Sequence, residues 1–444
     1  MKVVIVGASF AGVAAALEVR KKHPHLEIIL LEKQATLGYI PNGLHLYWEK
    51  KIEHLDEARF ITKEQLENHK IQCYLGATVQ KINTTQKIIH YDYSEQEELI
   101  SYDKLIIATG SRQLSEKIDG SAHESVLKYK RYGEAQAALA KVEESQHVTI
   151  IGGGQVGVEA ADLLNKQRKQ VTLIESMDYV LFKYLDEEMI QPIEQKMLEK
   201  GVNLKLRQTV SSIEETEDQK VTVHLGEESV TSDAVIMGVN VRPNLHFLDA
   251  QVELHMDQTI AVDRYLRTSV KDVFAVGDCI QLAGPGEDMV YIPLINNAVR
   301  TGIVAAANLM EPTVTFNGSL RTIGTSIFGY YIASTGMTEA ESLFTNQTIE
   351  TRRQTVRLNS LPNSDTATLK WVYNADTQVL LGAQMISTAN ILEKINTLAL
   401  AIQTKQTLED LQQKDYFFHP AYSPMVSTTN LVSWMEERVD EDES

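Results

Sequence analysis

The first 32 residues alternate between short apolar runs and one long alanine-rich stretch. Residues 3–6 are valine and isoleucine, as expected for a buried strand, and Gly7 ends this run. An alanine-rich segment follows and continues through Glu18 and Arg20, which predicts a helix. A second apolar run, EIILLE, ends at Glu32. A lysine before an uncharged run also outlines a secretory signal, but the charged residues within the predicted helix favour a strand, turn, helix and strand.

The predicted turn carries a glycine pattern with a known physical use. Gly7, Ser9 and Gly12 form G-x-S-x-x-G, and Glu32 ends the second strand twenty residues beyond Gly12. Gly7 permits a tight turn, the small Ser9 lets the backbone approach a pyrophosphate, and Gly12 lets the helix pack on the strand. The helix N-terminus attracts phosphate, while Glu32, which precedes Lys33, can accept hydrogen bonds from ribose hydroxyls. The unit predicts a dinucleotide site, with an ordinary βαβ turn as the alternative.

The same pattern recurs in HVTIIGGGQVGVEAADLLNKQRKQVTLIES. Gly152, Gly154 and Gly157 form G-x-G-x-x-G, and Glu175 follows eighteen residues later at the end of a predicted strand. One chain is therefore expected to bind two dinucleotides. Glu175 would repel a 2′-phosphate, and the residues that follow it include no arginine, so we expect NADH to be preferred to NADPH.

Composition narrows the class of protein. A chain of 444 residues with 43% hydrophobic content can form more than one core, since domains average ~150 residues. A formal charge of −18 would repel nucleic acid and an anionic membrane surface. The two cysteines, Cys73 and Cys279, are too few for a disulfide framework and lack metal-ligand spacing, so we expect no metal site and a reducing, cytoplasmic setting. Apart from the N-terminal run, no uncharged stretch reaches the ~20 residues of a membrane span, so we expect no membrane insertion.

Two further strand ends complete a recognisable order. YDKLIIATG ends at Thr109 and Gly110, and TSVKDVFAVGDC carries Gly277 and Asp278. Together with the two glycine fingerprints, GVNVRPN and the C-terminal DYFFHPAYSP, these segments resemble the FAD-dependent pyridine nucleotide-disulfide oxidoreductase family. The resemblance covers essentially the whole chain and is nearest to the branch of NADH oxidases, NADH peroxidases and coenzyme A disulfide reductases.

The resemblance implies an α/β fold with two Rossmann-like dinucleotide-binding domains, one for FAD and one for NAD, and a C-terminal α+β dimerisation domain. The FAD-binding domain would be discontinuous, comprising residues 1–113 and 241–315, with the NAD-binding domain, 114–240, inserted between them. Residues 316–444 would form the interface of a homodimer. The closing MEERVDEDES is expected to be an exposed acidic tail.

The resemblance also implies FAD and NADH as cofactors and assigns roles to single residues. Asp278 would bind the ribityl chain of FAD, and a helix that begins near Asn296 would direct its N-terminus at the flavin pyrimidine edge. Glu159 would lie near the nicotinamide, with a solvated helix glutamate as the alternative. The expected FAD-binding residues are Gly7, Ser9, Gly12, Glu32, Lys33, Thr109, Gly110, Gly277, Asp278, Asn297 and Ala298. The expected NAD-binding residues are Gly152, Gly154, Gly157, Glu159 and Glu175.

One position departs from the family pattern. The resemblance implies a single redox cysteine at the start of the helix after the first βαβ unit, but GYIPNGLHLYWEK places Asn42 there. An amide cannot become a thiolate, a sulfenic acid or a disulfide. Cys73 and Cys279 are expected to be small buried residues, and Phe10 stands where the peroxidases have a histidine.

Three functions follow from these residues. The first is an FAD-dependent oxidoreductase that passes electrons from NADH to oxygen or another small-molecule acceptor without a cysteine relay. The second is a reductase of a small thiol, disulfide or persulfide, and the third is a flavin and NADH binding sensor or scaffold with slow turnover. The candidate catalytic residues are Asn42, at the position of the redox cysteine, and His419. For His419, the family resemblance implies that a histidine before proline reaches the partner's site as an acid-base group, and a structural histidine is the alternative.

Overall fold

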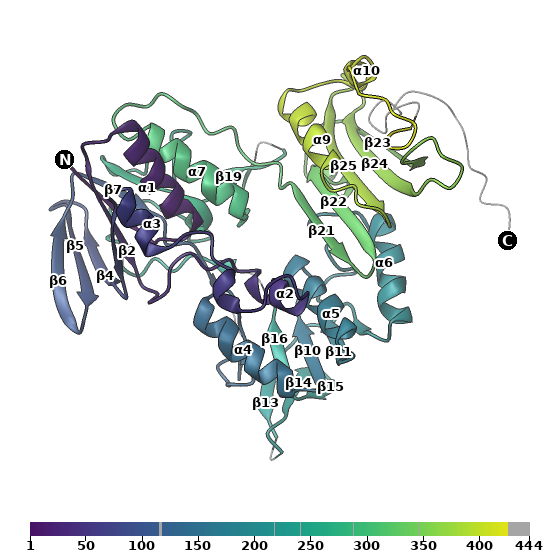
Figure 1. Cartoon of the computed structure of the whole chain (residues 1–444), viewed down its shortest axis with the longest axis horizontal. Helices are drawn as coiled ribbons and strands as arrows, with labels where there is room; N and C mark the ends of the chain where they lie inside the picture. Colours follow the sequence, from purple (N-terminus) through teal and green to yellow (C-terminus); the bar gives the residue numbers. More distant parts are fainter. Residues whose placement is uncertain (115–117, 217, 240, 287, 346, 425–444) are drawn as a thin grey trace.

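The computed structural model describes residues 1–114, 118–216, 218–239, 241–286, 288–345 and 347–424. The predicted acidic tail lies outside these residues. Figure 1 shows three lobes around a central region: the first contains α1 and α7, the second α4 and α5, and the third α9 and α10. Among the described residues, no helix has both the length and the apolar character needed to cross a bilayer.

The first lobe is built on a parallel five-stranded sheet in the order β18-β7-β1-β2-β3. Its strands are β1 (Lys2–Val6), β2 (Glu27–Glu32), β3 (Gln72–Leu75), β7 (Lys104–Ile107) and β18 (Val273–Ala275). The predicted first βαβ unit is present, because α1 (Phe10–Lys22) connects β1 to β2 and these strands pair in parallel. Residues 3–6 are fully or almost fully buried, which explains their unbroken apolar run.

Segments far apart in sequence complete this first lobe. Helix α7 (Ile295–Ala307) packs against α1 so closely that a Cβ on Gly302 would lie 2.3 Å from the Ala11 carbonyl oxygen. An antiparallel sheet formed by β4 (Thr78–Asn83), β5 (Ile88–Tyr93) and β6 (Gln96–Ser101) belongs to the same lobe. The short helix α3 (Lys63–Asn68) lies in this lobe, whereas α2 (Gly43–Trp48) packs on the second lobe, whose core includes Leu44 and Trp48.

The second lobe repeats the parallel architecture in the order β12-β11-β10-β16-β9. Its strands are β9 (Val126–Leu127), β10 (His147–Ile151), β11 (Gln170–Ile174), β12 (Asn203–Lys205) and β16 (Ala234–Met237). The second predicted unit is also present, since α5 (Gln155–Lys166) joins β10 to β11. The remaining elements are α4 (Tyr132–Glu144), α6 (Glu187–Glu199), β13 (Ser212–Glu215), β14 (Val221–Leu225) and β15 (Glu228–Ser232).

The two chain segments that connect these lobes lie side by side. β8 (Arg112–Gln113) leads toward the second lobe, β17 (Val241–Arg242) leads back, and the two strands pair antiparallel. Gln113 and Val241, where the predicted domain boundaries lie, pair with each other, and the division into domains stays a prediction. A short hairpin of β19 (Leu282–Ala283) and β20 (Met289–Val290) precedes α7.

The third lobe is an antiparallel sheet in the order β21-β22-β25-β24-β23. Its elements are β21 (Ile323–Ile327), β22 (Tyr330–Gly336), α8 (Glu339–Ser342), β23 (Ile349–Arg357), β24 (Thr366–Asn374), β25 (Leu380–Ser387), α9 (Lys394–Gln403) and α10 (Leu408–Gln412). β24 and β25 form a hairpin, and in its turn the Asn374 side chain accepts a hydrogen bond from the Asp376 amide at 3.1 Å.

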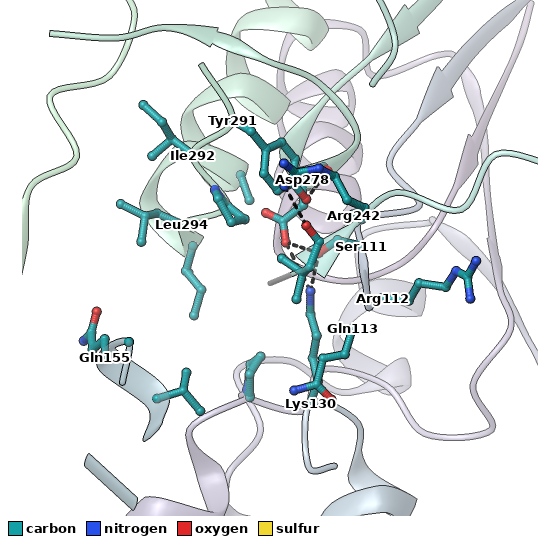
Figure 2. Close-up of a pocket in the computed structure, with 18 of the residues that line it drawn as sticks. Ser111, Arg112, Gln113, Lys130, Gln155, Arg242, Asp278, Tyr291, Ile292 and Leu294 are labelled. Atoms are coloured by element: carbon teal, nitrogen blue, oxygen red, sulfur yellow. Dashed lines mark hydrogen bonds and ion pairs between the residues drawn. The ribbon is translucent and has the colours of Figure 1, made fainter. Parts of the chain in front are cut away.

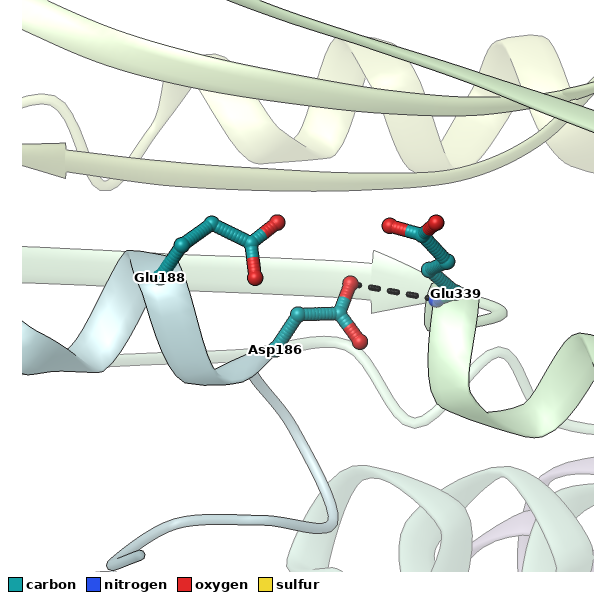
Figure 3. Close-up of side chains that lie close together, drawn as sticks. All are labelled: Asp186, Glu188 and Glu339. Carbon is teal, nitrogen blue, oxygen red and sulfur yellow. Dashed lines mark hydrogen bonds between the residues drawn. The ribbon is translucent and has the colours of Figure 1, made fainter.

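An ion cluster around the buried Lys370 joins the second and third lobes. Lys370 on β24 is 2% exposed, and its Nζ lies 2.9 Å from Asp186 Oδ2, 2.5 Å from Glu339 Oε2 and in contact with Glu188. Figure 3 shows the three carboxylates converging from α6 and α8. Burial opposes ionisation of Asp186, but hydrogen bonds from Lys370, Gln384 and the Glu339 amide outweigh it and lower the pKa of its carboxyl. The ammonium of Lys370 therefore occupies the centre of this carboxylate group.

Candidate functional site

A cavity of about 1770 Å³ is lined by residues from all three lobes. A single small-molecule pocket usually measures ~300–1,000 Å³, so this cavity is large enough for more than one ligand. Both predicted fingerprints line it, through Gly7 and Ser9 in one and Gly152 and Gly154 in the other. Figure 2 shows a part of it, where Asp278 and Lys130 lie across from Gln155.

The first fingerprint has the geometry that its residues predict. Gly7 has φ +102°, and a Cβ there would lie 2.2 Å from the Ala108 carbonyl oxygen. A Cβ on Gly12 would lie 1.9 Å from the Gly7 carbonyl oxygen, so Gly12 permits the contact between helix and turn. No described side chain caps α1 at Ser9, and its first turn carries no acidic residue. The free amide groups of this turn suit a pyrophosphate.

Glu32 is oriented by the backbone at the end of β2. Its Oε2 accepts a hydrogen bond from the Ala8 amide at 2.8 Å, and its Oε1 accepts one from the Gln34 amide at 2.8 Å. A carboxylate has about four lone-pair sites, so two remain for ribose hydroxyls. Glu32 and the neighbouring Lys33 both line the cavity, where an adenosine ribose of FAD would need them.

Asp278 lies in a polar cluster that the sequence did not reveal. Its Oδ2 accepts a hydrogen bond from Ser111 Oγ at 2.8 Å and lies 3.2 Å from Lys130 Nζ, which also donates to Ser111 Oγ at 2.5 Å (Figure 2). The Tyr291 hydroxyl donates to the Asp278 carbonyl at 2.9 Å, and Arg242 lies over the Tyr291 ring. Ser111 directly follows Thr109 and Gly110 in the predicted strand end, whereas Lys130 belongs to no motif. Only the tertiary fold brings Lys130 next to Asp278.

The residues expected around Asp278 divide into two groups. Thr109, Gly110 and Ala298 line the cavity, as does Asn296 at the start of α7. Asn297 is 2% exposed, and its side chain donates to the Ile292 carbonyl at 3.3 Å. Asn297 therefore supports the start of the helix from the protein side, and of these two asparagines it is Asn296 that lines the cavity. Gly277, with φ +73°, turns the chain into the short helical turn that presents Asp278.

The second fingerprint separates two kinds of glycine. Gly152 has φ +107°, and a Cβ on Gly157 would lie 1.9 Å from the Gly152 carbonyl oxygen. By contrast, a Cβ placed on Gly154 would meet no described atom within 4 Å beyond its own chain neighbours. Gly157 is therefore required by protein packing, whereas the space beside Gly154 belongs to the cavity. The N-terminus of α5 is also without a described side-chain cap.

Glu175 closes the predicted adenosine end of this second unit. It is 6% exposed, and it accepts hydrogen bonds from the Gly153 amide at 2.6 Å and the Met177 amide at 2.8 Å. The structure does bring an arginine to this neighbourhood, because Arg207 Nε lies 2.6 Å from Asp178 Oδ1. This differs from the local sequence, which has no arginine after Glu175. Arg207 is engaged by Asp178, so a 2′-phosphate beside Glu175 would still meet a carboxylate.

Glu159 is the centre of a buried hydrogen-bond network. Its Oε2 accepts from Asn42 Nδ2 at 3.3 Å and faces His45 Nδ1 at 3.1 Å. Its Oε1 accepts from Gln155 Nε2 at 2.9 Å and from Thr325 Oγ1 at 2.6 Å. The Glu159 side chain is 11% exposed, which excludes the solvated alternative. Glu159 is absent from the described cavity lining and lies behind Asn42, His45 and Gln155, which do line it.

His45 is a site residue that sequence reasoning missed. It is 5% exposed, and its Nε2 lies 2.9 Å from the Tyr129 hydroxyl, while its ring stacks on Trp48. Burial opposes ionisation of Glu159, but hydrogen bonding and charge from His45, together with the Thr325 and Gln155 hydrogen bonds, lower the pKa of its carboxyl. His45 stands one helical turn from Asn42, a spacing that could have suggested a shared face.

The two cysteines are buried, as predicted from their contexts, and neither lines the cavity. Cys73 on β3 and Cys279 are buried, and burial raises the pKa of each thiol to about 12. No cysteine occurs among the described residues that line the cavity. Phe10 lines it and stacks on Phe60 with ring centroids 4.1 Å apart. His419 is exposed, stacks on Tyr422, and is not among the described residues that line the cavity of its own chain.

Family comparison agrees with this architecture. Residues 1–302 match the model of the pyridine nucleotide-disulphide oxidoreductases, and residues 323–430 match the dimerisation domain of the same family. The chain therefore belongs to the pyridine nucleotide-disulphide oxidoreductase family, a family of flavoproteins.

Three relatives illustrate the similarity. An NADH oxidase of Enterococcus faecalis is 31% identical, over 98% of this chain and 98% of that one. A solved pyridine nucleotide-disulfide family oxidoreductase from the same species is 44% identical, with a TM-score of 0.89 and 97% coverage of both chains. The water-forming NADH oxidase of Lactobacillus brevis, solved with NADH, is 29% identical, with a TM-score of 0.93 and 97% coverage of both chains.

Proposed function

We propose that this chain is an FAD-dependent oxidoreductase that takes electrons from NADH and passes them to oxygen or another small-molecule acceptor without a cysteine relay. When bound, FAD accepts hydride from NADH and passes two electrons on to an acceptor. The observation that carries the proposal is the side chain of Asn42, which lines the cavity and donates to Glu159 where the family pattern has a thiol. The names of the NADH oxidase relatives support NADH as the donor.

The residues around the cavity suit both cofactors. The free first turns of α1 and α5 would bind the pyrophosphates, and Glu32 and Glu175 would accept hydrogen bonds from the two adenosine riboses. Asp278 would bind the ribityl chain from its cluster with Ser111 and Lys130. These contacts bind and align the two cofactors, and such alignment needs no thiol.

An anaerobic titration with NADH tests the proposal directly. We expect prompt bleaching of the yellow flavin and the uptake of only the electrons that one flavin accepts. Treatment with N-ethylmaleimide should leave turnover with oxygen unchanged, because Cys73 and Cys279 are buried thiols. Uptake of further electrons would favour a disulfide or persulfide reductase instead. A spectral shift without bleaching would favour a sensor or scaffold.

The Asn42→Cys variant tests the position itself. A thiolate beside oxidised flavin donates charge to it, so a long-wavelength absorption band should appear and grow as pH rises through ionisation of the new thiol. The neighbouring Glu159 carboxylate should make that ionisation harder than for a free thiol. The matched control is Asn42→Ser, because serine is similar in size to cysteine but has no sulfur, and this variant should show no such absorption band. A freely reactive thiol with an unchanged flavin spectrum would place residue 42 away from the flavin.

We also propose that the protein is a homodimer that assembles through the third lobe. The segments that flank its sheet expose large apolar side chains, with Phe344 84%, Phe417 75% and Phe418 57% exposed. A partner subunit would cover them, and His419 would then approach the partner's site. Sedimentation at micromolar concentration should give twice 49.8 kDa. Phe418→Glu should weaken the dimer, and Leu99→Glu on exposed β6 should not. A monomeric wild type would refute this assembly.

A further inference from the structure

Three polar side chains form a chain of hydrogen bonds along the cavity wall. Glu159 lies 3.1 Å from His45 Nδ1, and Tyr129 lies 2.9 Å from His45 Nε2, so both ring nitrogens are engaged. His45 and Tyr129 line the cavity, while Glu159 lies behind them. Three separate segments supply the members, namely α2, the strand connection before α4, and α5. Such an arrangement does not arise from local sequence, and the cofactor contacts described above leave it without a role.

The direction of these hydrogen bonds follows from the acidity of the end members. An ionised carboxylate only accepts, so Glu159, whose pKa is lowered, requires His45 Nδ1 to carry a proton. Burial raises the pKa of Tyr129, so its hydroxyl stays protonated. The second hydrogen bond has no such constraint, because His45 Nε2 can accept from the Tyr129 hydroxyl or donate to its oxygen. A carboxylate, an imidazole and a hydroxyl in series is the arrangement that serine hydrolases use to move a proton.

The surroundings of His45 keep this proton on a defined route. Glu159 from α5 and Tyr129 face the imidazole directly, and Tyr39, from the segment before α2, interacts electrostatically with Tyr129. Glu159 receives its other hydrogen bonds from Asn42, Gln155 and Thr325, which are neutral. Together with His45 they make four donors, which match the ~four lone-pair sites of a carboxylate, so the Glu159 side chain is fixed in place. It orients His45 and is itself unavailable to a ligand.

We propose that His45 holds and delivers, through Tyr129, the proton that acceptor reduction consumes. This rests on the proposed function, whose overall reaction is NADH + H⁺ + O₂ → NAD⁺ + H₂O₂, or the equivalent with another two-electron acceptor. NADH is oxidised, the acceptor gains two electrons, and one proton comes from solvent. At the wall, the N–H bond at His45 Nε2 breaks as an O–H bond forms on Tyr129. The original O–H bond of Tyr129 breaks as its proton passes to the acceptor, and His45 then regains a proton from water.

The test separates an acceptor that needs protons from one that does not. In the FAD-loaded His45→Gln variant, bleaching of the flavin by NADH should stay within about twofold of wild type. The return of the yellow colour with oxygen should slow ~100-fold, the usual worth of a positioned proton donor, and lose its solvent deuterium isotope effect. With ferricyanide, which takes electrons without protons, the return should match wild type. Melting temperature and bound FAD per chain should also match.

Two further variants exclude a structural role. Tyr129→Phe keeps the ring beside Trp48 but removes the hydroxyl, so it should reproduce the oxygen-specific defect even if His45→Gln does not fold. Tyr47→Phe removes a hydroxyl from the same helix α2 and should behave as wild type. If flavin reoxidation is slowed equally with oxygen and ferricyanide, or with neither, the proton route is overturned. Normal bleaching by NADH in the same experiment would still support the proposed function. Failure of NADH to bleach the wild type would overturn both.

Discussion

At the scale of single residues, the side chain at position 42 decides which chemistry the cavity wall can support. Asn42 supplies a neutral donor to Glu159, one of four donors around that carboxylate. A thiolate in its place would put a second negative charge next to Glu159, in a buried setting where like charges repel strongly. The amide thus suits a site whose redox group is the flavin alone.

Glu175 carries the second residue-scale prediction, which concerns the preference for NADH. Its carboxylate is held by two backbone amides at the end of β11 and would repel a 2′-phosphate. The Glu175→Gln variant keeps one acceptor oxygen but loses the charge. We expect the ratio of kcat/KM for NADH to that for NADPH to fall by about 10- to 100-fold, the worth of ~1.5–3 kcal/mol for a charged hydrogen bond.

Steady-state kinetics with both nucleotides measures this ratio. Asp178→Asn is the informative companion, because it releases Arg207 from its ion pair without touching Glu175. We expect Asp178→Asn to improve use of NADPH further when it is combined with Glu175→Gln. A wild type that uses NADPH as efficiently as NADH would contradict the role given to Glu175.

At the scale of elements, the turns that lead into helices α1, α5 and α7 provide free backbone amides for ligand binding. Helices α1, α5 and α7 begin at the cavity without a cap from any described side chain, whereas α3, α8 and α10 each begin with a threonine that caps the first turn. A cap would satisfy the amide groups that a phosphate or a flavin edge needs. Helices α6 and α9 also begin without such a cap, but away from the cavity, so it is their position that makes the free ends of α1, α5 and α7 available to ligands.

The glycines of the β10 to α5 turn give the element-scale prediction. Gly154→Ala adds a methyl group to the open cavity, so the melting temperature should stay within about a degree while KM for NADH rises about tenfold, which is ~1.4 kcal/mol. Gly157→Ala forces the helix away from the Gly152 carbonyl and should cost ~1–3 kcal/mol of unfolding free energy. Calorimetry should detect a loss of stability in Gly157→Ala but not in Gly154→Ala, and NADH kinetics should detect the raised KM in Gly154→Ala. Equal loss of stability in both would contradict the distinction.

At the scale of the whole molecule, polar and charged residues reinforce the apolar contacts that join the second and third lobes. Thr325 on β21 of the third lobe donates to Glu159 in the second, and Lys370 on β24 reaches Asp186 at the start of α6. The first of these contacts lies at the cavity wall. The shape of the cavity therefore depends on how the third lobe sits against the second.

Lys370→Met should lower the free energy of unfolding by ~3–5 kcal/mol, because it leaves the buried Asp186 carboxylate without its cation. The folded-state pKa of Asp186 is lowered, so its contribution to stability is present above its unfolded pKa, about 3.9, and is lost as pH falls through the folded value. The difference in the free energy of unfolding between wild type and Lys370→Met should therefore decrease below about pH 4. Denaturant unfolding at several pH values measures it.

The surface pair of Lys196 and Glu199 provides the control for this measurement. Lys196→Met removes an exposed ion pair of similar length and should change the free energy of unfolding by at most ~1 kcal/mol. A comparable loss in Lys196→Met and Lys370→Met would mean that burial of the cluster contributes nothing beyond a surface pair.

The sequence by itself determined the features that depend on neighbouring residues. A strand, a glycine turn, a helix and a second strand follow one another without interruption, so the two dinucleotide units could be predicted with their turn glycines and acidic ends, and the structure confirms both. The family, the α/β fold class and FAD as cofactor are confirmed by the family match that covers most of the chain. Burial of both cysteines was also predicted, and the structure confirms it.

Only the tertiary structure decided the contacts that join distant segments. His45 and Glu159 are 114 positions apart, Lys130 and Asp278 148 apart, and Thr325 and Glu159 166 apart. Period and spacing report on one strand or helix, so they carry no information on which polar side chains meet when separate sheets close around a cavity. Asn296 and Asn297 make the same point within one turn, since the packing of α7 alone decided which of them faces the cavity.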